Sequence, residues 1–227
     1  FNQLPTSGRG KGGLATFIRK SAFSSPQEIP CSSSRIQALT LHHLSSNTDI
    51  LFVNCYFPSG TSQSDISEYN ICLASVSSIL NSSCATVKLI AGDFNADVVC
   101  ISTRKRSVTL LKDFLSTESL TSLTSHYHQQ GDYTFMSDDG SKYSSIDGFL
   151  VPDHIVCLFS NFTIIKEHPL NSSDHRPVLI SLSLPDSPQA SARPLEQAVN
   201  GTSLERVTIQ WPSDKLETRE VYTEPLD

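Results

Sequence analysis

The chain has 227 residues, with 17 lysines and arginines, 23 acidic residues and a hydrophobic fraction of 38%. A net charge of −6 together with this apolar content excludes an intrinsically disordered chain. No window approaches the roughly 18 uninterrupted apolar residues that a membrane-spanning helix needs, and the pattern fits neither a coiled coil nor a secretory signal. The length suits one compact domain with an appendage, or two small domains.

Short apolar runs and one periodic segment organise the first half of the chain. The runs at residues 14–18, 36–44 and 50–56 have the composition of strands. From residue 66 to residue 80, apolar side chains recur at steps of three and four, which predicts an amphipathic helix. We expect Asp65 to cap the start of this helix, with Glu68 as the reciprocal acid.

The second half alternates short strands with a second helix. A strand at residues 87–91 ends at Gly92, and Ser107 is the expected N-cap of a helix whose inner side carries Val108 and Leu111. Further strands are predicted at residues 133–136, 145–151, 155–159, 162–165 and 177–184. Many short strands with two or three helices between them favour a layered α/β sandwich over a doubly wound parallel sheet.

The composition changes after Pro185, first to a Pro- and Ser-rich stretch and then to an acidic tail. We therefore expect one domain over residues 1–184 and a linker with a tail over residues 185–227. Within that tail, residues 204–211 could form one strand. The six cysteines lack the C-x-x-C spacing of zinc sites, so we expect buried free thiols and a reducing, intracellular compartment.

Three polar clusters lie at the ends of predicted strands, in the sequences GDFN from residue 92, SID from residue 145 and SDHRPV from residue 173. Phosphodiester hydrolysis needs hard oxygen ligands for a divalent ion, a group that orients or deprotonates water, and donors for the charge that grows on phosphorus. Asp147 and His175 form a natural pair, because a carboxylate on one imidazole nitrogen fixes the tautomer and raises basicity. Each cluster alone is more often a turn or a cap, and only their joint order indicates a site.

These motifs resemble the endonuclease/exonuclease/phosphatase superfamily, and within it the apurinic-site-like endonuclease domains of non-LTR retrotransposons. The similarity extends from Gly8 to about Leu184, and it rests on the sequences GRGKGGLA, VNCYFP, IAGDFNAD, YTF, SIDGFLV and SDHRPV. It implies a DNase I-like four-layer α/β sandwich of two mixed β-sheets flanked by helices. It also implies Mg²⁺- or Mn²⁺-dependent cleavage of DNA.

The resemblance further implies residue roles. Asp93 and Asn95 are expected beside the scissile phosphate and the attacking water, with Asp93 and Asp174 as metal ligands. His175, oriented by Asp147, is expected to stabilise the phosphate or to act as the base, and whether Asp93 or His175 removes the proton stays open.

Five further residues are expected around this centre. Tyr56 would donate its hydroxyl to the phosphate or leaving group, and Thr134 and Ser173 would support the site. Arg104 and Arg106 belong to a basic run that either faces DNA or forms a solvated surface.

Members of the family begin with two strands that end in an Asn and a metal-binding Glu, and this sequence starts after both. We therefore expect an N-terminally truncated domain that lacks the first strands, from a longer polyprotein with a reverse transcriptase. A nuclear location follows from the resemblance alone. Two alternatives stay open: a catalytically inactive remnant or binding module of the same fold, and a phosphatase or phosphodiesterase that acts on a phospholipid or inositol phosphate.

Overall fold

A computed structural model describes residues 13–24, 26–97, 99, 105–166, 171, 173–184 and 206–208 of the chain. Its centre is a six-stranded mixed sheet in which β3 and β4 are parallel and every other neighbouring pair is antiparallel. In spatial order the strands are β1 (Gln27–Ile29), β2 (Ile36–His43), β3 (Thr48–Tyr56), β4 (Val87–Asp93), β8 (Asp147–Pro152) and β5 (Leu120–Ser122).

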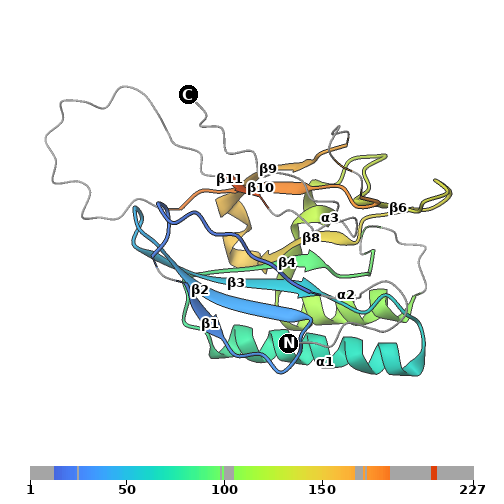
Figure 1. Cartoon of the computed structure of the whole chain (residues 1–227), viewed down its shortest axis with the longest axis horizontal. Helices are drawn as coiled ribbons and strands as arrows, with labels where there is room; N and C mark the ends of the chain where they lie inside the picture. The colour runs from blue at the N-terminus through green and yellow to red at the C-terminus, as the bar shows by residue number, and fades with distance from the viewer. Residues whose placement is uncertain are drawn as a thin grey trace, which may run out of the picture.

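Each face of this sheet is covered by a different layer (Figure 1). Helices α1 (Gln63–Ser82) and α2 (Arg106–Thr117) pack on one face and enclose the first apolar core. The second core lies between the large sheet and a small antiparallel sheet of β9 (Phe159–Ile164), β10 (Val178–Leu182) and β11 (Arg206–Thr208). Because β3 lies between both cores, the side chains of residues 50–55 are buried on both of its faces. These residues are therefore all apolar except Asn54, rather than alternately apolar and polar.

The remaining elements close the space between the two sheets. The short helix α3 (Leu123–Tyr127) and the 3₁₀ helix η1 (Asp153–Leu158) contribute side chains to the second core. The hairpin of β6 (Phe135–Met136) and β7 (Tyr143–Ser144) projects from one end of the molecule.

The α/β layering is confirmed, with two differences in the details. The part of the chain that the structure describes forms three layers, and no helix within it covers the outer face of β9–β11, so the expected fourth layer is not seen there. The mixed pairing belongs to the large sheet, whereas the described pairs of the small sheet are antiparallel.

Four local expectations were wrong. Ser62 rather than Asp65 is the N-cap of α1; Asp65 is the reciprocal acid of the capping box. Lys105 precedes α2 without a side-chain cap, and Ser107 is buried inside the helix. Residues 14–18 join no strand, and residues 155–158 belong to η1 rather than to a strand, because a short apolar run does not by itself distinguish a strand from a helical turn.

The five cysteines among the described residues are free thiols, as expected, but only Cys55 and Cys72 are buried; the expectation of burial was wrong for Cys84 and Cys157, which are exposed. No helix in the described ranges has the length and apolar character needed to cross a bilayer. Strand β11 lies inside the predicted 204–211 segment. The division at residue 184 stays a prediction, because most of the following residues lie outside the described ranges.

Candidate active site

Three adjacent strands bring Tyr56, Asp93 and Asp147 to one end of the large sheet. Asp93 is the register partner of Tyr56 in the parallel β3–β4 pair and of Asp147 in the antiparallel β4–β8 pair. Ala91 and Phe149 lie two residues from the two acids and pack in the core between the sheets. Because side chains alternate along a strand, Asp93 and Asp147 face the same side and are buried at its rim, with 4% and 2% of their surfaces exposed.

Gly92 allows β4 and β3 to approach closely just before the acid. A Cβ at this position would lie 2.0 Å from the carbonyl oxygen of Cys55, and the backbone φ is +155°. Any other residue would therefore force the two strands apart. The glycine of the GDFN sequence is thus required by the packing that positions Asp93.

Asn95 fixes the loop that leaves β4. Its backbone lies in the left-handed region with φ of 48°, and its N–H donates to Oδ1 of Asp93 at 2.9 Å. Its side-chain Nδ2 donates to Oδ2 of Asp93 at 3.1 Å and to the carbonyl oxygen of Phe57 at 2.8 Å. Asn95 therefore holds the Asp93 carboxylate in one orientation.

Thr134 supports the opposite acid from a fully buried position. Its hydroxyl oxygen accepts hydrogen bonds from the backbone N–H groups of Ile146 and Asp147, both at 3.0 Å. Its carbonyl accepts from the N–H of Arg176 at 2.7 Å. One side chain and one carbonyl thus connect the start of β8 to the loop that carries His175.

The loop before β10 is held by side-chain bonds to its own backbone. The hydroxyl of Ser173 accepts from the N–H of His175 at 3.0 Å, and Nδ2 of Asn171 donates to the carbonyl of His175 at 3.0 Å. The His175 ring also lies 5.1 Å from the ring of Phe135, centroid to centroid. Asn171 was missed from the sequence, since an Asn in a polar loop carries no signal of its own.

His175 is bound by Asp147 through one ring nitrogen. Nδ1 of His175 lies 2.9 and 3.0 Å from the two carboxylate oxygens of Asp147. Burial alone would lower the pKa of His175, but the hydrogen bond to Asp147 and the negative charges of Asp147, Asp93 and Asp174 outweigh it and raise this pKa to about 9. The ring is therefore an imidazolium at neutral pH in the metal-free protein.

Asp93, Asp147 and His175 could hold a metal ion. Each offers one ligand atom, and the three atoms lie within 4.8 Å of one another. Burial, followed by repulsion from Asp147, raises the pKa of Asp93. Two buried carboxylates that repel each other are the donors that a hard divalent cation prefers and neutralises, so Asp93 and Asp147 fit Mg²⁺ or Mn²⁺, whereas His175 could bind a metal only after losing a proton.

The other expected residues are spread around this cluster. Asp174 is exposed and lies outside the group of three, although its charge acts on His175. Tyr56 is half-buried at the end of β3. Arg106 begins α2 with an exposed side chain, and Arg104 lies outside the described residues.

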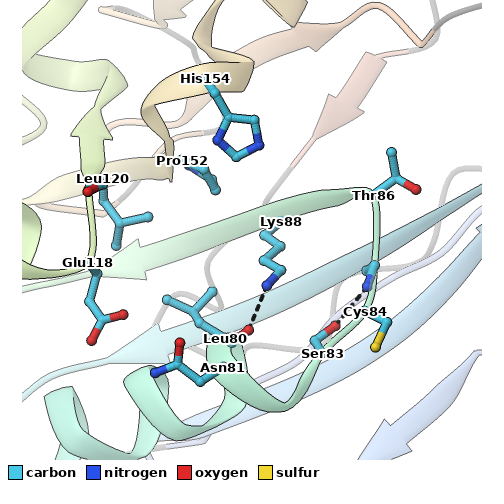
Figure 2. Close-up of a pocket in the computed structure, with 12 residues that line it drawn as sticks. Leu80, Asn81, Ser83, Cys84, Thr86, Lys88, Glu118, Leu120, Pro152 and His154 are labelled. Atoms are coloured by element: carbon cyan, nitrogen blue, oxygen red, sulfur yellow. Dashed lines mark hydrogen bonds between the residues drawn. The ribbon is translucent and has the colours of Figure 1, made fainter.

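A cavity of about 520 Å³ lies at the other end of the sheet. Figure 2 shows Lys88, near the start of β4, and His154 among the residues that line it. Nζ of Lys88 donates to the carbonyl of Leu80 at 2.6 Å, which satisfies a carbonyl in the last turn of α1. The acid and histidine cluster is thus separate from this cavity.

The sequence matches a family model described as endonuclease-reverse transcriptase over residues 50–179. This match covers more than half of the 227 residues, and the chain belongs to that family. No curated protein matches the sequence.

Solved structures show the same fold at low identity. The endonuclease domain of TRAS1, a telomere-specific non-LTR retrotransposon, is 18% identical with a TM-score of 0.52, over 70% of this chain and 68% of that one. The AP endonuclease LMAP from Leishmania major is 16% identical with a TM-score of 0.55, over 67% of this chain and 55% of that one. The 3′ phosphatase NExo from Neisseria, bound to a product DNA hairpin, is 17% identical with a TM-score of 0.51, over 64% of each chain. The matches place the chain in the endonuclease/exonuclease/phosphatase superfamily.

Proposed function

We propose that this chain is a divalent-metal-dependent endonuclease that hydrolyses DNA phosphodiester bonds and nicks DNA as retrotransposon endonucleases do. The observation that carries the proposal is the buried cluster of Asp93, Asp147 and His175 at one end of the sheet. Membership of the endonuclease-reverse transcriptase family supports DNA as the substrate.

In this proposal His175 is a donor rather than a base. Asp147 occupies Nδ1, so Nε2 is the nitrogen left for a substrate. In the metal-free protein its pKa of about 9 gives the ring a proton on both nitrogens at neutral pH. Nε2–H would donate to a phosphoryl oxygen and stabilise the charge that grows there.

Asp93 would then orient and deprotonate the attacking water. Burial raises its pKa in the metal-free protein, and a cation held beside it would keep the carboxylate ionised and able to accept the proton. Asn95 donates to both of its oxygens and fixes the direction in which the carboxylate accepts a proton. A bound Mg²⁺ or Mn²⁺, held by Asp93 and by Asp174 at the rim, would supply Lewis-acid stabilisation of the phosphoryl charge.

The remaining expected residues keep supporting roles. Tyr56 would donate its hydroxyl to the phosphate or leaving group, while Thr134 and Ser173 hold the backbone on either side of the Asp147–His175 pair. Arg104 and Arg106 would contact the DNA backbone. We also propose a four-layer sandwich for the whole domain over residues 1–184, a nuclear location, and an origin in a polyprotein with a reverse transcriptase.

The same fold also supports a second candidate, removal of a phosphate group. One of the similar structures is a 3′ phosphatase, and fold similarity at such identities does not distinguish it from an endonuclease. An inactive remnant is the third reading.

One experiment separates the three. Supercoiled plasmid, 3′-phosphorylated DNA and an inositol polyphosphate are incubated with the protein in Mg²⁺, with and without EDTA. The proposal predicts nicked plasmid, lost in EDTA and reduced by at least about 100-fold in Asp93→Asn and His175→Gln, and retained in Asp113→Asn on the exposed side of α2. Phosphate release without nicking selects the second candidate, and no reaction from folded protein selects the third.

A further inference from the structure

Arg35, just before β2, touches Tyr56 in three ways. Its carbonyl accepts from the N–H of Tyr56 at 2.9 Å, and its guanidinium Nη1 donates to the carbonyl of Tyr56 at 3.3 Å. Its Cζ also lies 5.4 Å from the centroid of the Tyr56 ring, within cation–π range. Backbone and side chain of Arg35 thus both act on the last residue of β3.

Glu68 of α1 holds the guanidinium in this position. Nε of Arg35 lies 2.7 Å from Oε1 of Glu68, and Nη2 lies 3.4 Å from Oε2. A guanidinium that donates through two nitrogens to one carboxylate has less rotational freedom than one that makes a single hydrogen bond, because its plane cannot turn without breaking one of the two. The side chains of Arg35 and Glu68 are 26% and 46% exposed, so water weakens the attraction and leaves the orientation as the main effect.

We propose that Arg35, anchored by Glu68, is a positioning residue that sets the orientation of the Tyr56 ring at the rim of the candidate active site. This inference rests on the proposed function of that site, in which the Tyr56 hydroxyl meets the phosphate or leaving group. Arg35 itself acts through Tyr56: its guanidinium is held on Glu68, on the Tyr56 carbonyl and against the ring.

A purely structural role makes a different prediction. An Arg35–Glu68 pair that only fastens α1 to the sheet would change stability when removed and leave the Tyr56 ring and its contribution to the reaction unaltered. A positioning role couples Arg35 to Tyr56, so the loss of activity in the double variant would be smaller than the two separate losses combined.

The first readout needs no activity. In metal-free protein with ¹³C-labelled tyrosine rings, the Tyr56 signal is assigned by its loss in Tyr56→Phe. We expect Arg35→Gln and Glu68→Gln to shift that signal, and Lys112→Gln on the exposed face of α2 to leave it in place. Glu68→Gln keeps Arg35 and the backbone bonds, so it serves if Arg35→Gln does not fold. An unmoved Tyr56 signal in a folded variant overturns the proposal.

The second readout is DNA nicking. Arg35→Gln should lower kcat by about 10-fold with KM little changed, and should add less than about 2-fold when Tyr56 is already Phe. Full additivity overturns the positioning role. If the native chain nicks no DNA, the proposed function fails, and the ring signal alone decides whether Arg35 positions Tyr56.

Discussion

Asp147 meets His175 with both of its carboxylate oxygens, at 3.0 and 2.9 Å from the same ring nitrogen. The contact joins the first residue of β8 to the loop before β10, and so connects the large sheet to the small one. The hydroxyl of Thr134 accepts from the N–H of Asp147, and the hydroxyl of Ser173 accepts from the N–H of His175. The pair is therefore fixed from both sides before any substrate binds.

Removing the charge of Asp147 should lower the pKa of His175. In Asp147→Asn with EDTA present, we expect this pKa to fall from about 9 toward its ordinary value of 6.5. A pH titration of His175 by NMR measures it, with His175→Gln identifying its signal among the seven histidines. Asp113→Asn, on α2, should leave the titration unchanged.

The same shift predicts a pH dependence of stability. A histidine whose folded pKa exceeds its unfolded pKa adds stability that is complete below pH 6.5 and is lost as the pH rises through about 9. Between these limits the free energy of unfolding of the native protein should drop by on the order of 2 kcal/mol more than that of His175→Gln. The free energy of unfolding is measured by urea unfolding at each pH. If it changes with pH in the same way in both proteins, the raised pKa of His175 is contradicted.

Gly92→Ala should destabilise the fold by about 3 kcal/mol, because its Cβ would lie 2.0 Å from the Cys55 carbonyl oxygen. Gly140 is the matched control: its φ is +65°, yet nothing lies within 4 Å of a Cβ there. Gly140→Ala should therefore cost only about 1 kcal/mol, from backbone strain alone. Urea unfolding measures the stability of both variants. An equal loss of unfolding free energy in Gly92→Ala and Gly140→Ala would argue against the close approach of β3 and β4.

Thr134→Val should cost about 2 to 4 kcal/mol, because the buried N–H groups of Ile146 and Asp147 lose their acceptor. Thr134→Ser keeps the hydroxyl and should retain most of the stability. Thr163, exposed on β9, gives a control with the same substitution and an expected change below about 0.5 kcal/mol. An unchanged free energy of unfolding in Thr134→Val would show that the Thr134 hydroxyl does not hold Asp147.

The strands that carry the site could be predicted from the sequence, because their patterns are local. Apolar runs locate β3 and β4, and the polar residues Tyr56 and Asp93 mark the ends of these two strands. A capped helix was also recognisable, but Ser62 and Asp65 are both good caps, and only the hydrogen bonds show which one accepts from the helix backbone.

Contacts between distant residues could not be predicted in the same way. Arg35 and Glu68 are separated by 33 positions, and Thr134 and Asp147 by 13. No spacing rule links such pairs, because the sheet order brings them together only after the chain has folded. For the same reason Asn171 and the burial of Asp93 emerged only from the structure.

The most direct test of the proposed metal site, held by Asp93 with Asp174 at the rim, is Mn²⁺ binding to the metal-free protein, followed by electron paramagnetic resonance. The account predicts one saturable site, weakened by about 10-fold or more in Asp93→Asn, weakened also in Asp174→Asn, and unchanged in Asp113→Asn. Binding that survives Asp93→Asn, or no saturable binding by the folded native chain, would contradict it.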